Sequence, residues 1–364
     1  MSFFSEYKTV NGLLNQKHKV VFYAESRHYY PYFEKLLHDL INKVPVVYIT
    51  SDKADPLLVN KIPGLKVIYI KWLLGFAFSK IRANVMIMTM PDLGNYLFKR
   101  SANVDCYIYM FHAAVSIHQQ YRQHAFDNYD TIFCTGDYQQ KELRRMEQLY
   151  NLKQKEIIEY GYPLLDALKT KPGNANQTIL VAPSWYPNGI FESCFDELLS
   201  TLSKMPYPVI IRSHPEYEKR NKKKYKKIKE QISRYSHMQI DNLTSITERL
   251  PLSDILITDR SGIAFEFAFG MGKPVLFIDT PPKINNSNYT ELEIEPIENS
   301  LRSELGITIS PGSLHQLPDK FDALFRQANE FAEKMDQIKK KIFYNSLASY
   351  KAGLEYVLEK VGKD

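Results

Sequence analysis

The chain has 364 residues, of which 44% are hydrophobic and 24% are charged. This length suits two domains and this apolar fraction suits a sizeable core, so the composition excludes a wholly disordered chain. The formal net charge of +6 fits an anionic substrate or an anionic membrane surface.

The cysteines and the apolar runs restrict the class of protein further. Cys106, Cys134 and Cys194 are widely spaced, which excludes a disulfide framework and a zinc pattern. Cys106 and Cys134 lie inside apolar runs, so we expect them to be buried. No run reaches the roughly 18 apolar residues of a membrane span, and the first residues lack a long apolar signal core. We therefore expect a cytoplasmic protein.

Short apolar runs alternate with helical segments in the first half of the chain. Residues 31–43 place Phe33, Leu36, Leu37, Leu40 and Ile41 on one face of a helix. Continuous β-rich runs of this kind are typical of a buried parallel sheet. They predict strands at 18–26, 46–50, 66–70, 84–90, 105–111 and 131–136. The apolar stretch 70–78 is too short to span a bilayer, so we interpret it as a core helix, with an interfacial wedge as the alternative.

The composition changes to Lys, Pro, Gly and Asn at residues 163–177, and the strand–helix pattern then restarts. Strands are predicted at 178–184, 208–215, 238–241, 255–258, 275–279 and 307–310, and residues 313–361 look largely helical. We therefore expect an α/β protein with two Rossmann-like domains facing a cleft and a helical C-terminus. The expected division is an acceptor domain at 1–168, a linker at 169–177, a nucleotide-donor domain at 178–345 and a helix at 346–364 that packs back on the first domain.

A turn and a helix start follow the predicted strand 255–258. The turn is Asp259-Arg260-Ser261-Gly262, and helix N-termini at the carboxyl ends of parallel strands bind anions. Gly262 lets an anion approach the backbone, Ser261 adds a donor, and Glu266 lies one turn further on for sugar hydroxyls. The alternative is an ordinary turn with a serine cap. The chain lacks the glycine patterns of dinucleotide and P-loop sites.

Two neighbouring residue sets complete the predicted site. Arg212 and His214 follow the strand at 209–211 and point to one side, as a phosphate clamp requires. His112 ends the strand at 105–111, where it is a candidate general base facing the clamp across the cleft. The alternatives are an arginine–glutamate pair and structural histidines. His118 and His124 follow His112 at a spacing of six, which does not favour a three-histidine metal site.

Eight of the eleven residues from 219 to 229 are basic. The helical spacing of Tyr225, Ile228, Ile232 and Tyr235 predicts one helix with a buried stripe and a basic outer face. The residues expected to contact an anionic lipid or polymer are Lys222, Lys223, Lys226 and Lys227. The alternative is a solvated face, and no recognition motif supports nucleic-acid binding.

Four segments resemble motifs of the CDP-glycerol glycerophosphotransferase family, which contains the teichoic-acid primases and polymerases. The segment 178–185 resembles a strand ending in Ala-Pro-Thr-Trp, and Arg212-Ser-His214-Pro resembles Arg-x-His-Pro. The segment 253–266 resembles Ala-Asp-x-Leu-Ile-Ser-Asp-Tyr-Ser-Ser-x-x-Phe-Asp, and 158–166 resembles a segment with Gly-x-Pro-Arg-x-Asp. The similarity spans roughly residues 105–285.

The resemblance implies a glycosyltransferase-B fold and a set of site residues. Its Arg-x-His-Pro histidine and its serine turn handle the CDP diphosphate, which implies a donor site at Ser184, Arg212, His214, Asp259, Arg260, Ser261, Gly262 and Glu266. A histidine in a His-Gly-Thr-Pro-x-Lys motif is the family's base, which implies that role for His112. Here Ala113-Ala-Val-Ser-Ile follows His112, Gly262 replaces the second serine, and Glu266 replaces the aspartate.

The expected function is therefore transfer of glycerol phosphate, or a related polyol phosphate, from a CDP-activated donor to a hydroxyl of a cell-surface polymer or glycolipid precursor. No metal or cofactor is expected, because basic groups can stabilise the charge of phosphoryl transfer. The expected partners are the donor, a glycan or lipid-linked acceptor and an anionic inner membrane surface, without nucleic acid. The alternatives are a sugar transferase of the same fold that uses a UDP- or CMP-sugar, and a non-catalytic protein that binds an anionic polymer.

Overall fold

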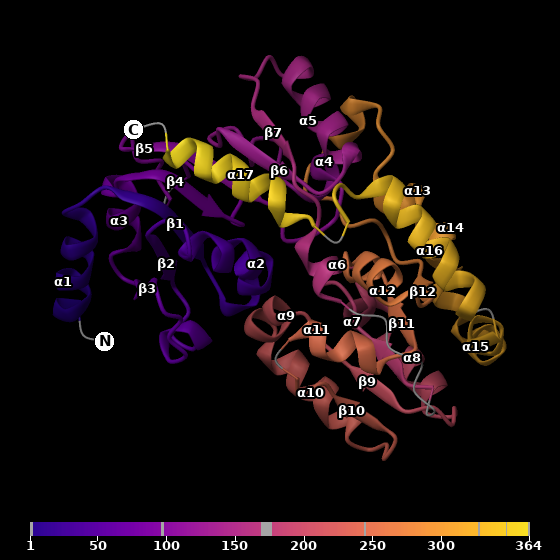
Figure 1. Ribbon diagram of the computed structural model, residues 1–364. Helices are drawn as coiled ribbons and strands as arrows, with labels where there is room; N and C mark the ends of the chain where they lie inside the picture. The colour runs from indigo at the N-terminus through magenta and orange to yellow at the C-terminus, as the bar shows by residue number, and fades with distance from the viewer. Residues whose placement is uncertain are drawn as a thin grey trace.

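The computed structural model describes residues 3–95, 98–168, 177–243, 245–326, 328–346 and 348–362. The described chain forms two parallel sheets with helices packed around them, as the alternating strand–helix pattern predicts (Figure 1). The fold class expected from the sequence is confirmed.

The first sheet has seven strands in the order β3-β2-β1-β4-β5-β6-β7. Its strands are β1 (His18–Ala24), β2 (Val46–Thr50), β3 (Leu65–Tyr69), β4 (Ala83–Met88), β5 (Val104–Met110), β6 (Thr131–Cys134) and β7 (Glu156–Glu159). The helices of this half are α1 (Phe3–Leu14), α2 (Tyr30–Ile41), α3 (Leu74–Lys80), α4 (Ile117–Gln120), α5 (Asp137–Leu149) and α6 (Pro163–Ala167), with short 3-10 turns η1 (Arg27–Tyr29) and η2 (Pro56–Leu58). The central strands are buried on both faces, which explains their continuous apolar runs.

The second sheet has six strands in the order β10-β9-β8-β11-β12-β13. Its strands are β8 (Ile179–Val181), β9 (Val209–Ile211), β10 (Met238–Ile240), β11 (Ile255–Thr258), β12 (Val275–Ile278) and β13 (Gly306–Ile309). Its helices are α7 (Ile190–Ser193), α8 (Phe195–Leu202), α9 (Pro215–Arg220), α10 (Lys222–Ile232), α11 (Ile246–Arg249), α12 (Ile263–Met271), α13 (Ile297–Ser300) and α14 (Arg302–Leu305), with turns η3 (Leu250–Leu252), η4 (Tyr289–Leu292) and η5 (Pro311–Gln316). The strand order reverses at β8–β11, so the ends of these strands form a switch point for ligands.

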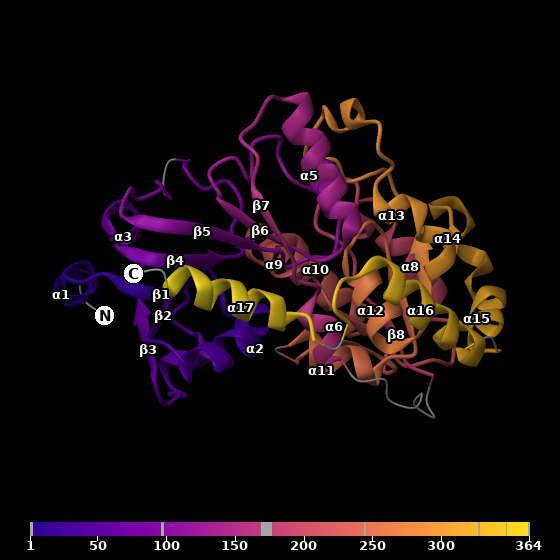
Figure 2. The same ribbon diagram turned by 45° about the horizontal axis from the view of Figure 1, so that its top comes forward.

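The C-terminal helices lead the chain back to the first sheet. They are α15 (Leu317–Arg326), α16 (Ala328–Ile342) and α17 (Tyr350–Val361). Helix α17 lies along the first sheet and contacts α2, β4 and β7 (Figure 2). The Tyr356 hydroxyl donates to Glu156 Oε2 at 2.6 Å and lies 2.6 Å from Thr131 Oγ1. The expected linker lies outside the described residues apart from Gln177, and the expected domain limits remain a prediction.

Three features of the fold differ from the sequence expectations. Helix α1 and edge strand β7 carry no continuous apolar run, so the pattern did not predict them. The basic run forms two helices rather than one, because the non-helical backbone of Asn221 separates α9 from α10. Trp72 lies before α3 with 69% of its surface exposed, so the core-helix interpretation of residues 70–78 is wrong for this side chain.

Candidate functional site

The turn after β11 is organised around a buried carboxylate. Asp259 Oδ1 accepts from the Ser184 N–H at 2.7 Å, and Asp259 Oδ2 accepts from the Ile190 N–H at 3.1 Å. These bonds tie the loop after β8 to the end of β11. The Asp259 carboxylate, expected at the donor site, is therefore paired with backbone N–H groups and shapes the site, and Ser184 takes part in this contact through its backbone N–H.

The side chains of the two residues after Asp259 differ in their contacts: Arg260 is bound by the loop after β12, whereas Ser261 lines a pocket. The Arg260 guanidinium donates to Asp279 Oδ1 at 2.8 Å and to the Thr280 carbonyl at 2.9 Å. Ser261 is half-buried and lines a pocket at the start of α12, where its hydroxyl has no partner within the described residues. Ser261 is therefore the turn side chain best placed to bind a ligand.

Gly262 brings the two halves of the chain together. Its φ of −60° is open to any residue, so its backbone angle does not require glycine. A Cβ at this position would lie 3.1 Å from Val115 Cγ1, in the loop that follows His112. The missing side chain thus leaves room for that loop, whereas the sequence suggested room for an anion.

His214 caps helix α9 and is held in one tautomer. Its Nδ1 accepts from the Glu216 N–H at 3.2 Å, so the proton of the neutral ring is on Nε2. The ring lies 5.9 Å from that of Trp185. Burial, followed by the nearby Lys283 charge, lowers the pKa of His214 to about 4. His214 is therefore a neutral hydrogen-bond donor at neutral pH.

Arg212 is anchored at the end of β9 by an acidic partner. Its Nη1 donates to Asp241 Oδ2 and, at 3.0 Å, to the Leu243 carbonyl. Asp241 also pairs with Arg249 at 2.7 Å. The charge of Arg212 still lowers the pKa of Glu266 and of His28, which places it beside the space between the two sheets. The sequence did not identify Asp241 as its partner.

His112 has the complementary tautomer. Its Nδ1 lies 3.1 Å from the Thr89 carbonyl, which can only accept, so Nδ1 carries the proton and Nε2 has the lone pair. Burial is the main cause that lowers the pKa of His112 to about 4. Its charge would in turn lower the pKa of His214, so the two rings lie near each other across the two sheets. This geometry suits a general base.

The other two histidines of the first half do not join His112. His118 is fully buried, with Nδ1 at 3.2 Å from Glu142 Oε2 and Nε2 at 3.0 Å from the Ile294 carbonyl. His124 is exposed and lies 2.8 Å from Asp127. His118 is therefore a structural residue, whose loss would destabilise the protein. Within the part of the chain that the structure describes, no group of His, Cys, Asp and Glu side chains is arranged to hold a metal ion.

Glu266 lies where the two halves of the chain meet. Its Oε1 accepts from the Tyr162 hydroxyl at 2.8 Å, and that hydroxyl lies 3.4 Å from the His112 carbonyl. Burial raises the pKa of Glu266 to about 7. Protonation of Glu266 is therefore linked to the contact between the two sheets.

We expect the Glu266→Gln variant to be more stable than the wild type above neutral pH. The folded-state pKa of about 7 exceeds the ordinary value of 4.5, so the folded protein binds more protons between these values. The stability of the wild type therefore falls as the pH rises through this window, by roughly 3 kcal/mol. Melting temperatures at about pH 5 and about pH 8 measure this, and equal falls in both proteins would contradict the assignment.

Sequence reasoning missed Lys283, in the loop after β12. Its Nζ lies 5.9 Å from the centre of the Trp185 ring, and its charge lowers the pKa of both His112 and His214. It has no carboxylate within ion-pair distance in the described ranges. Lys283 therefore lies close enough to both histidines to act on their pKa values, and burial, opposed by the charges of Asp259 and Glu298, lowers its own pKa. No motif or periodicity in its loop indicated this.

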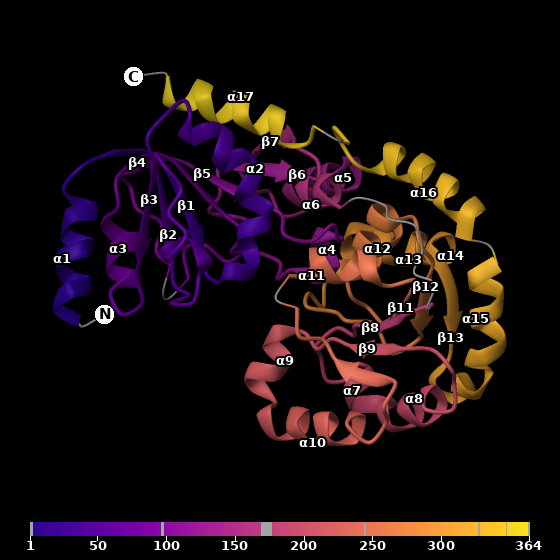
Figure 3. The same ribbon diagram turned by 60° about the horizontal axis from the view of Figure 1, so that its bottom comes forward.

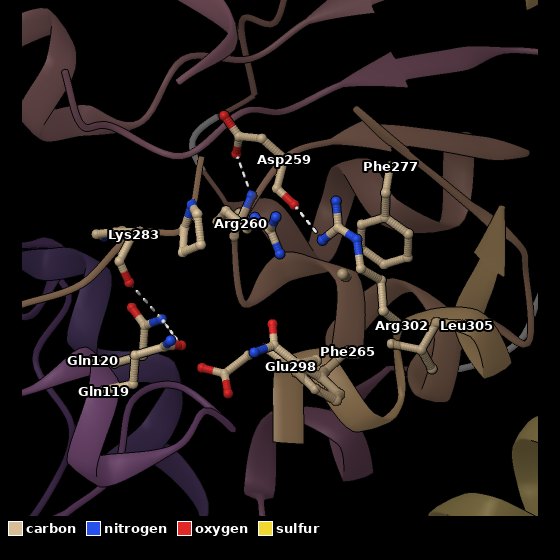
Figure 4. Close-up of a pocket in the computed structure, with 14 residues that line it drawn as sticks. Gln119, Gln120, Asp259, Arg260, Phe265, Phe277, Lys283, Glu298, Arg302 and Leu305 are labelled. Carbon is tan, nitrogen blue, oxygen red and sulfur yellow. Dashed lines mark hydrogen bonds between the residues drawn. The ribbon is translucent and has the colours of Figure 1, made fainter. Parts of the chain in front are cut away.

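The pocket beside Ser261 contains further residues that the sequence did not indicate. Figure 4 shows Gln119 and Gln120 approaching it from the first half of the chain, and Glu298 and Arg302 from the second. Arg302 Nη1 donates to the Asp259 carbonyl at 3.0 Å. Buried atoms without a hydrogen-bond partner are Gln119 Nε2, Glu298 Oε2 and Arg302 Nε. Such atoms favour a polar occupant.

Comparisons with known proteins identify what the chain resembles. A family model described as CDP-Glycerol:Poly(glycerophosphate) glycerophosphotransferase matches residues 7–281. A structure of a histidine-to-asparagine variant of the wall teichoic acid polymerase TagF, soaked with CDPG, is 16% identical with a TM-score of 0.61, over 99% of this chain and 93% of that chain. The S. aureus MnaA–UDP structure is 10% identical with a TM-score of 0.60, over 96% and 98%. A glycosyltransferase from Rickettsia africae is 13% identical with a TM-score of 0.54, over 96% and 100%. The search of curated proteins gives no match.

Proposed function

The chain belongs to the CDP-glycerol:poly(glycerophosphate) glycerophosphotransferase family, and from this premise we propose how its residues carry out the transfer. It is a glycerophosphotransferase-type transferase of the glycosyltransferase-B fold, acting on a CDP-activated glycerol or related polyol phosphate in teichoic-acid synthesis. The acceptor we propose is a hydroxyl of a cell-surface polymer or glycolipid precursor.

The observation that carries the residue roles is that two neutral histidines of opposite tautomer, His112 and His214, both lie within the influence of the Lys283 charge. His112 Nε2 accepts the proton of the acceptor hydroxyl, and the hydroxyl oxygen forms a bond to the phosphorus next to the glycerol. The bond from that phosphorus to the bridging oxygen breaks, and CMP leaves with the electron pair. His214 Nε2–H, Lys283 and the Ser261 hydroxyl stabilise the charge on the departing phosphate.

The low pKa of His112 results from burial and from the nearby charge of Lys283, and it is compatible with a role as general base. The pKa of about 4 belongs to the protein without an anion, where Lys283 disfavours a charged ring. A bound diphosphate offsets the lysine charge and raises the pKa toward the range of an effective base. The base is thus strengthened when the donor is present.

We expect CDP-glycerol to stabilise the protein more than UDP-sugars or CMP-sugars do. A ligand at about 100 times its dissociation constant adds about 2.7 kcal/mol of stability, which a thermal-shift screen detects. Stabilisation by a UDP- or CMP-sugar, with turnover of that sugar, would support a sugar transferase instead. Binding of anionic polymer without turnover of any donor would support a non-catalytic protein.

The proposed polymer or membrane contact of helix α10 rests on its exposed charges. The side chains of Lys222, Lys223, Lys226 and Lys227 are exposed, while Tyr225 and two isoleucines form the buried face. Lys226 lies 3.8 Å from Glu230, a spacing that leaves it weakly paired. Such a face attracts an anionic surface, which would place the protein at the inner side of the membrane.

A further inference from the structure

The pocket beside Ser261 holds three polar atoms that have no hydrogen-bond partner in the described part of the chain. They are Gln119 Nε2, Arg302 Nε and Glu298 Oε2, and all three atoms are buried. Only 3% of Gln119 is exposed, and its side chain lines the pocket. A buried polar atom without a partner costs free energy, so the pocket favours an occupant that supplies the missing bonds.

Contacts between the two halves of the chain fix the glutamine and the glutamate of this pocket. The Gln119 carbonyl accepts from the Asn285 N–H at 3.0 Å, in the loop that also carries Lys283. Glu298 Oε1 accepts from the Ser116 N–H at 3.2 Å, which leaves Oε2 as the oxygen without a partner. Figure 3 shows α4, which contains Gln119, at the junction of the two halves, where Ser116 at its start contacts α13. Both side chains are therefore held in place before a ligand binds.

The arginine is fixed on the other side of the pocket. Its Nη1 donates to the Asp259 carbonyl at 3.0 Å, and its guanidinium lies 4.2 Å from the centre of the Phe277 ring. Figure 4 shows Arg302 across the pocket from Gln119 and Gln120. The three unpartnered atoms thus belong to side chains that lose little conformational entropy when a ligand binds.

The position of the pocket links it to the group that the donor transfers. Ser261 and Lys283, proposed above to contact the diphosphate, also line the pocket. Gln119 belongs to the segment that follows His112, the proposed base. Glu266, expected to bind sugar hydroxyls, is not among the residues that line the pocket. The pocket is therefore adjacent to the reacting phosphate, where the transferred group is attached.

We propose that this pocket binds the polyol of the donor through its free hydroxyl groups, and that the three unpartnered atoms select glycerol over longer polyols. The inference rests on the function proposed above. Glycerol attached to a phosphate keeps two free hydroxyls, which accept from Gln119 Nε2 and Arg302 Nε and donate to Glu298 Oε2. Ribitol keeps four free hydroxyls, so at least one of them would be buried without a partner.

An anionic occupant fits the pocket less well than a polyol does. Burial raises the pKa of Glu298. Its carboxyl group therefore accepts a hydrogen bond when it is ionised and donates one when it is protonated. A hydroxyl matches both forms, whereas an anion is repelled by the ionised form.

Calorimetric titrations of CDP-glycerol and of CDP test the proposal, because CDP lacks the polyol. The Gln119→Leu variant should bind CDP-glycerol about 2–12-fold more weakly than the wild type does, and CDP equally well. We expect this variant to fold, because leucine is similar in size and the Asn285 contact uses the backbone of Gln119. The matched control Gln123→Leu changes a glutamine of the same segment that does not line the pocket, and it should leave both affinities unchanged.

Two further measurements do not depend on Gln119→Leu. The Glu298→Gln variant keeps an oxygen for the Ser116 contact but replaces the accepting atom with a donor, so it should lose affinity for CDP-glycerol and not for CDP. The wild type should bind CDP-glycerol at least about fivefold more tightly than CDP-ribitol, since a buried hydroxyl without a partner is costly. Thermal melts identify which variants are folded.

Three results would overturn the polyol pocket. Equal losses of CDP and CDP-glycerol affinity in the folded variants would assign the pocket to the nucleotide. Unchanged affinities in both variants, or equal binding of CDP-glycerol and CDP-ribitol by the wild type, would show that the pocket does not select the polyol. If the wild type still turns over CDP-glycerol, these results leave the proposed function intact. A wild type that neither binds nor turns over CDP-glycerol would instead overturn the proposed function, and this inference with it.

Discussion

The His112→Ala variant is expected to lose turnover by about 10²–10⁴-fold, the usual scale for removal of a general base. Its nucleotide binding should stay close to that of the wild type, because His112 acts on the acceptor hydroxyl rather than on the nucleotide. The hydrogen bond to the Thr89 carbonyl fixes Nε2 as the accepting atom, and alanine has no group that replaces it. Initial rates with CDP-glycerol and calorimetric titration of CDP measure the two quantities.

The matched control for this experiment is His124→Ala. His124 is exposed, and its partner Asp127 belongs to the same surface turn, so turnover and stability should change little. His118→Ala is not a suitable control, because the buried pair with Glu142 would be broken and the variant would lose stability. Near-normal turnover in a folded His112→Ala protein would remove His112 from the mechanism.

The pH dependence of the reaction provides a second check on His112. The base must be unprotonated, and its pKa in the protein without donor is about 4. The value of kcat/KM reports this form of the enzyme, so the histidine alone should leave kcat/KM flat from neutral pH down toward this pKa. In the donor complex the diphosphate raises the pKa, so kcat should begin to fall at a higher pH than kcat/KM. Identical profiles would argue against coupling between the base and the bound anion.

The sequence predicts those site residues that stand at the ends of buried strands. His112 follows β5, His214 follows β9 and Ser261 follows β11, and the continuous apolar runs locate all three strands. The carboxyl ends of parallel strands meet at one edge of a sheet, which is where ligands bind. Locating the apolar run of each strand therefore also predicts that the residues that follow it lie at the ligand site. The resemblance to a known family then adds the roles of these residues.

Long-range partners account for what the sequence does not reveal. Arg212 is bound by Asp241, and the pocket beside Ser261 includes Gln119 and Arg302, which lie far apart in the chain. Helical spacing likewise shows that α3 has an apolar face, but it cannot show whether that face has a partner. Trp72 is 69% exposed, and no element among the described residues covers it.

Lys283 is another residue of the site that the sequence did not reveal. Its substitution is the second change from which we expect a large loss of nucleotide affinity. The Lys283→Gln variant should bind CDP about 10–150-fold more weakly, since a hydrogen bond to a charged group contributes about 1.5–3 kcal/mol. Lys283 forms no ion pair in the described ranges, although the charges of Asp259 and Glu298 act on it, so its ammonium group can still donate to a bound phosphate. Calorimetric titration of CDP measures the loss.

The Lys283→Arg variant is the matched control, because it keeps the positive charge and should retain more affinity than Lys283→Gln. A second readout does not depend on nucleotide. The lysine charge lowers the pKa of His112 and of His214, so both values should rise in Lys283→Gln and can be followed by NMR titration of the imidazole protons. If both pKa values rise while CDP affinity stays at the wild-type level, Lys283 lies between the histidines but does not hold the diphosphate, and the donor phosphates must bind elsewhere along the start of α12.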